Sequence, residues 1–475
     1  MEKIERIEKR VSLWQAIMIM LVLLAFIVVG VIIYGLDAQI PILLAAVFTT
    51  LVGFVNGVKW EKMEASIMNS LTAVLQAVVV LLVIGIMLGT WLQSGVVPSM
   101  IYYGGLVISP KFFLPTACLL CSMTSLATGD SWGTAGTVGI ALLGIGIGMG
   151  MPMALVIGAV ISGSYFGDKL SPMSDTTLLA SGTCEVNIFE HVKYMLYTTV
   201  PSLCIALIAY FFLGLKYANN VDMAELTELL NGLKDAVNIS PVLLLAPVFV
   251  IAMIILKVPP IPSLMCGALI GSAFAMIFQG CSLEEVLSAM HYGVAMETGN
   301  EVIDSLIAGG GLDYVMWTVS LVFCAMILGG IMESVGVFSV IVETMLAKVK
   351  TAGGLIATTV VTCIFMNFTA SDQYLAILFP SNMYKGKYDE LGLERKVLSR
   401  TLEDAGTLTS ALVPWNTCGA FLTGLFGVGP LVYAPFAILN WMNPIMAIIY
   451  GFTGFSIKYK DKAPAEVAET AVEAE

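Results

Sequence analysis

The chain contains several stretches without a charged residue that are longer than a helix needs to cross a lipid bilayer. Residues 65–110, 131–167 and 405–457 carry no Asp, Glu, Lys or Arg. About 20 apolar residues are enough for an α-helix to span the hydrocarbon core. Only 12% of the 475 residues are charged, whereas an ordinary soluble domain has about 25%. We therefore expect an all-α polytopic membrane protein, and the pattern excludes a soluble enzyme, a nucleic-acid binder and a β-barrel of short alternating strands.

The uncharged stretches and the Gly and Pro residues between them predict about ten transmembrane helices. The expected crossings are 12–36, 39–58, 68–93, 152–184, 192–215, 238–256, 261–279, 313–334, 396–426 and 431–456. The apolar stretches 112–148 and 352–384 each have a polar centre, which predicts two re-entrant hairpins. Helices 152–184 and 396–426 are interrupted by Gly, Pro and polar residues, so we expect them to be discontinuous.

Basic residues predict the orientation in the membrane. Lys and Arg concentrate in the first ten residues, after the second crossing, around 385–400 and at 458–462, whereas the loop 217–237 is mostly acidic. Cytoplasmic loops of membrane proteins are enriched in Lys and Arg. We therefore expect both termini in the cytoplasm, with 217–237 as an extracytoplasmic linker and 458–475 as an acidic cytoplasmic tail.

The two halves of the chain show a weak internal similarity. The segment from Gly89 resembles the segment from Gly330, the surroundings of Asp130 resemble those of Asp372, and Asp168 pairs with Asp404 in the same order. Five crossings separate the copies, and an odd number inverts the second copy. We expect a first inverted repeat over 1–216 and a second over 238–457, an organisation typical of secondary transporters.

The first hairpin has a polar tip with a carboxylate, formed by Thr128, Asp130 and Thr134. A charge at the bilayer centre costs about 2.5–3.5 kcal/mol even on the mildest scale, so its presence favours a functional role. Broken backbone at this depth is tolerated where it lines a watery cavity. The alternative is a loop in solvent outside the membrane.

The interruption of helix 152–184 combines two carboxylates with several hydroxyls. Its candidate cation- or proton-binding residues are Asp168, Ser171, Ser174, Asp175 and Thr176. Hard oxygen ligands of this kind suit Na⁺ or H⁺ better than a soft metal ion. The adjacent lysine is expected to neutralise Asp168 when no cation is bound. A plain cytoplasmic turn is the alternative.

The second half carries two corresponding polar segments. Ser371 and Asp372 form the tip of the second hairpin, and the interruption of helix 396–426 supplies Asp404, Thr407, Ser410, Asn416 and Thr417. We expect Asp372 and Asp404 to bind cations or protons. The substrate-binding candidates are Thr128, Thr134, Ser371, Thr407, Ser410, Asn416 and Thr417. Two alternatives remain: Asp404 could pair with Arg400 at the surface, and Asn416 with Thr417 could cap a half-helix.

Several functions are disfavoured by what the sequence lacks. It has no GxxxxGK[ST] phosphate loop for ATP hydrolysis, and its two histidines exclude a His-rich metal site. An intramembrane enzyme would need a nucleophile with a base or a metal dyad. We therefore expect no enzymatic activity and no cofactor, with Na⁺ and H⁺ as coupling ions. No arginine is expected within the membrane to hold an anionic substrate.

Three motifs resemble those of a known family. GDKLSPMSDTT at 167–177, SRTLEDAGT at 399–407 and VPWNTCGA at 413–420 look like the NhaC family of sodium/proton antiporters, including its sodium-lactate/malate-proton branch. The resemblance covers about 12–455. It implies inverted repeats, a homodimer, an elevator motion and a prokaryotic inner-membrane location. It also implies one Na⁺ site at Asp130, Asp168 and Asp175 and a second at Asp372, Asn416 and Thr417.

These observations together predict a secondary transporter that exchanges Na⁺ for H⁺. A small organic acid such as malate or lactate is expected to share the cavity, and membrane lipid is the other partner. The NhaC family, which the chain resembles, belongs to the wider ion transporter superfamily, whose members usually have Ser-Asn-Thr at the hairpin tips. The acidic tips of this chain favour binding of a cation or proton over binding of an anion alone. A Na⁺-coupled amino-acid symporter on the same fold and an ion channel are the alternatives.

Overall fold

The chain is helical throughout the part that the structure describes. The computed structural model describes residues 10–107, 109–218, 223–256, 258–295, 298–300, 303–304 and 307–460. Within them the only β-type pairings are two isolated bridges. Among the described residues, nine helices are long and apolar enough to cross a membrane, or up to eleven if each of two bent helix pairs is one crossing. The prediction of an all-α polytopic membrane protein with about ten crossings is confirmed.

The helical elements follow one another with short connections. The first half contains α1 (Leu13–Ile27), η1 (Val28–Ile33), α2 (Gln39–Val55), α3 (Trp60–Gln93), α4 (Val96–Val107), η2 (Pro110–Phe112), α5 (Phe113–Thr128), α6 (Ser131–Thr134), η3 (Ala135–Gly139), α7 (Ile140–Gly148), α8 (Met153–Leu170), α9 (Asp175–Thr183), α10 (Ile188–Ala218) and α11 (Met223–Ala236). The second contains η4 (Pro241–Leu244), α12 (Leu245–Ile255), α13 (Pro260–Phe278), α14 (Leu283–Tyr292), α16 (Leu312–Val335), α17 (Val337–Leu346), α18 (Ala352–Thr369), α19 (Gln373–Glu390), α20 (Arg395–Leu402), η5 (Glu403–Thr407), α21 (Leu408–Ser410), α22 (Thr417–Phe426), α23 (Pro430–Tyr433), η6 (Ala434–Phe436) and α24 (Ile438–Thr453).

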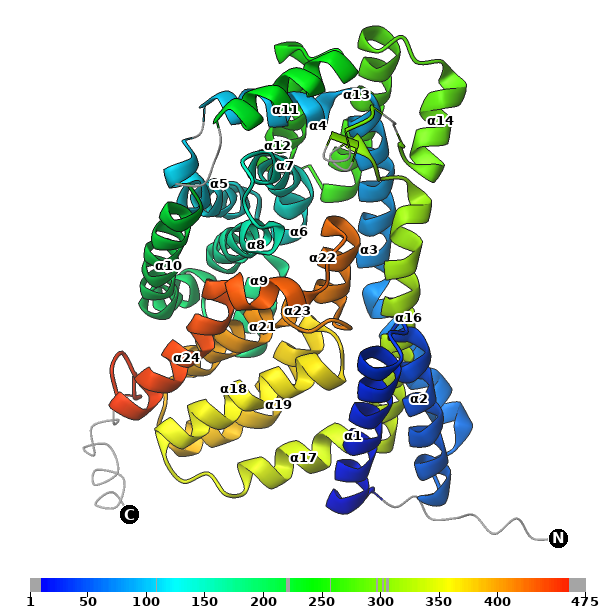
Figure 1. Cartoon of the computed structure of the whole chain (residues 1–475). Helices are drawn as coiled ribbons and strands as arrows, with labels where there is room; N and C mark the ends of the chain where they lie inside the picture. Colours follow the sequence, from blue (N-terminus) through cyan, green and yellow to red (C-terminus); the bar gives the residue numbers. More distant parts are fainter. Residues whose placement is uncertain are drawn as a thin grey trace, which may run out of the picture.

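One group of helices is built around the long helix α3. Helix α3 packs against α13, α14 and α16, and α16 packs against α2, which contacts α1. These helices run along one side of the molecule (Figure 1). The outer faces of α1 and α2 expose large apolar side chains such as Trp14, Leu21 and Val55. Such faces are stable against lipid because the hydrocarbon is as apolar as the side chains.

The second group is centred on α8, which is buried along most of its length. Helices α5, α7, α10 and α24 pack around it. Gly163 and Gly167 allow α5 to approach closely, since a Cβ on Gly163 would lie 2.1 Å from the carbonyl oxygen of Cys118 and one on Gly167 would lie 2.3 Å from that of Ser122. Small residues at such contacts are the usual means by which membrane helices pack tightly.

The backbone is interrupted at the four places where the sequence predicts it. Helices α5 and α6 meet at Gly129 and Asp130, and α18 and α19 meet at 370–372. Helix α8 stops at Leu170 and α9 begins at Asp175, while 411–416 separate α21 from α22. The division into two inverted repeats stays a prediction.

The predicted linker 217–237 contains a helix. Helix α11 has polar residues on one side, and its last part forms a pair with the segment Pro241–Met253 that is bent by 92°. Residues 1–9 and 461–475 lie outside the described residues, and the predicted acidic tail falls mostly within the second of these ranges. The orientation inferred from the terminal lysines and arginines therefore stays a prediction.

Candidate cation site

A cavity of about 650 Å³ lies where the first hairpin tip, the first broken helix and the second hairpin tip converge between the two helix groups. Helix α3 closes one side, and Val258 and Pro259 close another. The cavity is lined by Ala73, Gln76, Val80, Thr128, Gly129, Asp130, Ser131, Trp132, Asp168, Met173, Ser174, Asp175, Thr176, Leu179, Val258, Pro259, Gln373 and Tyr374. Its charged lining residues are three carboxylates. Of the sequence-predicted residues of the first half, all but Thr134 and Ser171 line this space.

Asp130 forms the start of the second arm of the first hairpin. Its backbone is extended, and its Oδ1 accepts a hydrogen bond from the backbone N–H of Trp132 at 2.9 Å, so it caps α6. Thr134 donates its hydroxyl to the Asp130 carbonyl oxygen at 2.8 Å, and Thr128 Oγ1 accepts from the Asp130 N–H at 3.3 Å. The predicted tip is thus stabilised by hydrogen bonds among its own residues. The tip is packed against the first broken helix, and its place within the membrane stays a prediction.

Asp168 is the most enclosed carboxylate of the cavity. It lies in the last turn of α8 and is 5% exposed. Ser131, from the hairpin tip, donates its hydroxyl to Asp168 Oδ2 at 2.6 Å. A buried carboxylate is costly unless it is hydrogen-bonded, paired or neutralised. With one side-chain hydrogen bond, Asp168 is suited to take up a cation or a proton.

The interruption between α8 and α9 presents further oxygen atoms. Ser171 Oγ accepts the backbone N–H of Met173 at 3.3 Å, and Ser174 Oγ lies 3.1 Å from Thr176 Oγ1. Ser174 and Thr176 line the cavity together with Asp175, whose side chain is exposed. These residues form one wall of the cavity, and their role in cation binding stays a prediction.

The second hairpin tip lies against the second broken helix. Asp372 caps α19, with Oδ1 accepting from the backbone N–H groups of Tyr374 and Leu375, and its Oδ2 accepts from Thr417 Oγ1 at 3.2 Å. The carbonyl oxygen of Ser371 accepts from the Thr417 N–H at 2.9 Å. Asp372 itself does not line the cavity, whereas its neighbours Gln373 and Tyr374 do.

The remaining candidates of the second half are bound to one another. Asn416 accepts from the Cys418 N–H at 3.0 Å and donates to Asn367 Oδ1 at 3.1 Å, so the capping alternative is confirmed for Asn416. Ser410 donates to the Thr407 carbonyl oxygen at 2.6 Å. Neither Thr407 nor Ser410 lines the cavity.

Asp404 is fully buried and is separate from the cavity lining. It pairs with Lys169, and its Oδ2 lies 3.6 Å from Arg400 Nε. The expected pairing with Arg400 exists, but it is internal rather than at the surface. Lys169, expected to neutralise Asp168, instead neutralises Asp404. Arg400 is also fully buried, and it does not line the cavity.

Several residues of the site were missed by sequence reasoning. Ser131, Trp132 and Tyr374 lie next to predicted residues, and the helix starts at the two tips could have indicated them. Gln76 is a polar residue in an uncharged stretch, which is the same signal that identified the carboxylates. Trp132 stacks on Phe421 with ring centroids 4.2 Å apart, which fixes the first tip against α22.

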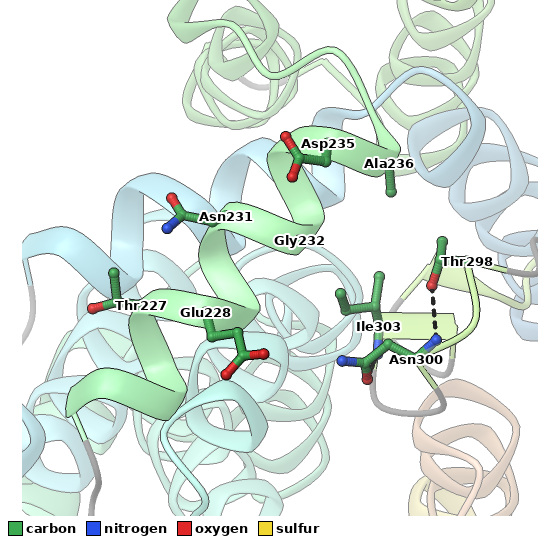
Figure 2. Close-up of a pocket in the computed structure, with 9 residues that line it drawn as sticks. All are labelled: Thr227, Glu228, Asn231, Gly232, Asp235, Ala236, Thr298, Asn300 and Ile303. Carbon is green, nitrogen blue, oxygen red and sulfur yellow. Dashed lines mark hydrogen bonds between the residues drawn. The ribbon is translucent and has the colours of Figure 1, made fainter.

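A different cavity, of about 930 Å³, lies beside α11. Figure 2 shows Glu228, Asn231 and Asp235 on the helix, and Thr298, whose Oγ1 accepts from the Asn300 N–H at 3.3 Å, on the facing segment. None of its described lining residues comes from a hairpin tip or a broken helix. The cavity at Asp168 is therefore the candidate cation site.

The chemistry of the Asp168 cavity is that of a weak site for a hard cation. Carboxylate, hydroxyl and amide oxygens line it, and these are the ligands that alkali cations prefer. Among the described residues no three His, Cys, Asp or Glu side chains cluster closely enough to hold one metal ion together. Asp130, Asp168 and Asp175 therefore face one space without forming a single carboxylate cluster, and hydroxyl and backbone oxygens would complete the coordination of a cation there.

Comparisons with known proteins agree with this geometry. Residues 163–455 match the Na⁺/H⁺ antiporter family. The chain is 35% identical to the Na⁺/H⁺ antiporter NhaC of Alkalihalophilus pseudofirmus over 95% of this chain and 97% of the relative. It is 35% identical to the malate-2H⁺/Na⁺-lactate antiporter of Bacillus subtilis, covering 94% and 96%. It is 36% identical to the arginine/ornithine antiporter ArcD of Halobacterium salinarum, covering 98% and 97%.

These relatives are named as transporters and not as enzymes, and the similarity extends over nearly the whole of each chain. It includes both hairpins, both broken helices and the cavity between them. The resemblance of the three sequence motifs is therefore confirmed, and the chain belongs to the NhaC family of Na⁺/H⁺ antiporters.

Proposed function

We propose that the protein exchanges Na⁺ for H⁺ across the prokaryotic inner membrane, with the Asp168 cavity as its binding site. The observation that carries the proposal is a nearly buried carboxylate, with one side-chain hydrogen bond, facing a cavity whose charged lining is acidic. Such a carboxylate is neutralised either by a proton or by Na⁺. Occupancy by one excludes the other, and this exclusion converts a proton gradient into Na⁺ movement.

The arrangement of helices supports an elevator motion. The first hairpin and the first broken helix pack with α8, and the second hairpin packs against α9, η5 and α24, whereas α1, α2, α3, α13 and α16 form the other group. Helix α22 of the second broken helix lies at the contact between the groups, because it packs against α16. The cavity lies between the two groups, since α3 forms one of its walls. In the proposed motion the first group slides against the second and carries the cavity from one side of the membrane to the other. The second group would supply the dimer interface.

An organic solute would share this cavity, which is much larger than Na⁺ requires. A malate or lactate anion would need its own hydrogen-bond donors, and helix N-termini often supply them. Here Asp130, Asp372 and Asn416 already accept from the first N–H groups of their helices. An organic acid would therefore enter together with a cation and use the hydroxyls of Thr128, Ser131 or Ser174.

A second candidate is a solute that carries an ammonium group, such as a basic amino acid. The acidic lining favours it, because three carboxylates face the cavity and Lys169 points away from it. The name of the Halobacterium salinarum relative mentions arginine and ornithine, which are solutes of this class. Exchange of such a solute would use the same carboxylates and the same motion.

Reconstituted vesicles test these proposals. Purified protein in proteoliposomes should change the pH of the lumen when a Na⁺ gradient is imposed. The Asp175→Asn variant should take up less Na⁺ than the parent. A Glu228→Gln variant, on α11 and outside the cavity, serves as the matched control and should transport like the parent. Uptake of labelled malate, lactate, arginine and ornithine, with and without Na⁺ and pH gradients, identifies the solute. If Asp175→Asn transports Na⁺ as well as the parent does, the assignment of Asp175 is wrong.

A further inference from the structure

A second polar centre lies behind the cavity, where α8, α10, η5 and α24 meet. Asp404 is at its centre, and one of its oxygens, Oδ1, accepts three hydrogen bonds. The donors are Lys169 Nζ from α8, Thr198 Oγ1 from α10 at 2.8 Å and Asn443 Nδ2 from α24 at 2.8 Å. A single carboxylate oxygen thereby connects four helical elements that are distant in the sequence.

A further carboxylate lies beside this centre without a hydrogen bond of its own. Glu403 is fully buried, and neither of its carboxylate oxygens has a hydrogen-bond partner among the described residues. An unpartnered buried carboxylate is expensive, and Lys169 forms its ion pair with the adjacent Asp404.

The two successive carboxylates lie on a segment that is buried all round. Residues 403–407 form the π-helical turn η5, and all five are buried, as are the α-helical residues 397–402 before them and Leu408–Ser410 after them. Turns of this kind occur frequently at functional sites. Helix α8 contacts η5 at this point.

The positive charge at this centre comes from the chain itself. Lys169 is fully buried and forms an ion pair with Asp404. Arg400 contributes a second charge, with Nε 3.6 Å from Asp404 Oδ2, and its guanidinium also lies over the Tyr194 ring. Asp168, adjacent to Lys169, faces the cavity instead. The last turn of α8 therefore directs a carboxylate to one side and an ammonium to the other.

We propose that Asp404 forms a monovalent-cation site that is filled permanently by the ammonium group of Lys169. The ligand class of this site is a primary ammonium ion or an alkali cation. The tethered ammonium fastens the last turn of α8 to η5 and so joins the two broken helices. Lys169 is thus a positioning residue for Asp168, and the number of exchangeable cations is limited to those in the cavity.

Chemical rescue tests the proposal. Lys169→Ala removes the ammonium and leaves a gap that a small alkylammonium ion can fill. Purified full-length Lys169→Ala should unfold at a lower temperature than the parent, and ethylammonium or propylammonium should raise its unfolding temperature. Tetramethylammonium, which has no N–H donor for Asp404, should not. If Lys169→Ala yields little folded protein, expression and purification with propylammonium should restore the yield, which is an equivalent readout.

Two further variants distinguish binding of an alkylammonium ion at this site from a general stabilising effect of amines on the protein. Lys169→Ala combined with Asp404→Asn removes the carboxylate, so alkylammonium ions should no longer stabilise the protein. Lys385→Ala removes a lysine that pairs with Glu185 outside the membrane-spanning helices, and it should show no amine response. Equal stabilisation of the parent, of the double variant or of Lys385→Ala would overturn the proposal, as would no stabilisation of Lys169→Ala.

The proposal goes beyond Na⁺/H⁺ exchange and can fail independently of it. The unfolding measurement reports binding in detergent and requires no transport. Na⁺-driven proton flux through the parent, measured in vesicles, tests the exchange. Rescue of Lys169→Ala without flux through the parent would overturn the proposed exchange alone, and flux without rescue would overturn the tethered-cation site alone.

Discussion

The two hairpin tips have the same local design but different surroundings. Each has a residue in the left-handed region, Gly129 with φ 70° or Ser371 with φ 60°, followed by an aspartate that caps the next helix. The first tip lines the cavity. The second is fastened to the second broken helix, because Thr417 donates both its hydroxyl and its backbone N–H to this tip.

The two broken helices differ in the same way. Asp168 faces the cavity and receives one side-chain hydrogen bond, whereas Asp404 is enclosed by three donors and a nearby arginine. Similar segments therefore place their carboxylates differently. Asp168 faces the cavity, whereas Asp404 connects α8, α10, η5 and α24. The comparison predicts that equivalent substitutions will damage different properties.

Asp404→Asn should have the largest effect on stability. It would leave Lys169 and Arg400 buried without their shared carboxylate, and breaking a buried ion pair from one side costs about 3–5 kcal/mol. Thermal unfolding of the purified variant in detergent measures the loss. An unfolding temperature equal to that of the parent would contradict the role of Asp404 as the centre of a structural network.

Asp168→Asn should instead abolish Na⁺/H⁺ exchange while leaving the protein folded. The substitution removes a charge that faces the cavity, and the amide oxygen can still accept from Ser131. Na⁺-driven proton flux should fall to the level of empty vesicles, with an unfolding temperature close to that of the parent. A variant that still exchanges Na⁺ would show that the essential carboxylate lies elsewhere.

The two tips can be compared by substituting the residue with positive φ in each, Gly129 in the first tip and Ser371 in the second. In Gly129→Ala a methyl group would enter a left-handed position and lie 3.0 Å from the Met173 backbone, so we expect a loss of about 1–3 kcal/mol. Ser371→Gly should stabilise by up to about 1 kcal/mol, because it relieves the same strain and the serine hydroxyl has no hydrogen-bond partner among the described residues. Unfolding temperatures give both values. Changes of the same sign would contradict the comparison.

The sequence was sufficient to predict the fold class and the positions of all four backbone interruptions. Uncharged length, glycine, proline and isolated carboxylates are local signals, and they identified Asp130 and Asp168 correctly as neighbours of one cavity. The partners of Lys169 could not be predicted, because Asp404, Thr198 and Asn443 meet it only after α8, η5, α10 and α24 have packed. The π-helical turn at 403–407 has no distinct sequence pattern either.

The smallest expected effect concerns an exposed ion pair, which contrasts with the buried pair at Asp404. Arg395 donates to Glu185 in the connection between α9 and α10 and so lowers the pKa of the Glu185 carboxyl. Since the folded-state pKa lies below the unfolded value of about 4.3, the contact stabilises the protein above that pH. Its contribution disappears as the pH falls through the lowered pKa. Arg395→Gln should therefore lower the unfolding temperature slightly at pH 7 and by less at pH values of about 3.

High salt should reduce the effect of Arg395→Gln on the unfolding temperature at pH 7, because exposed charges are screened. The effect of Asp404→Asn should persist in high salt. If the effect of Arg395→Gln did not depend on salt, the Arg395–Glu185 pair would be as little screened as the buried network at Asp404, and the contrast between the two pairs would be wrong.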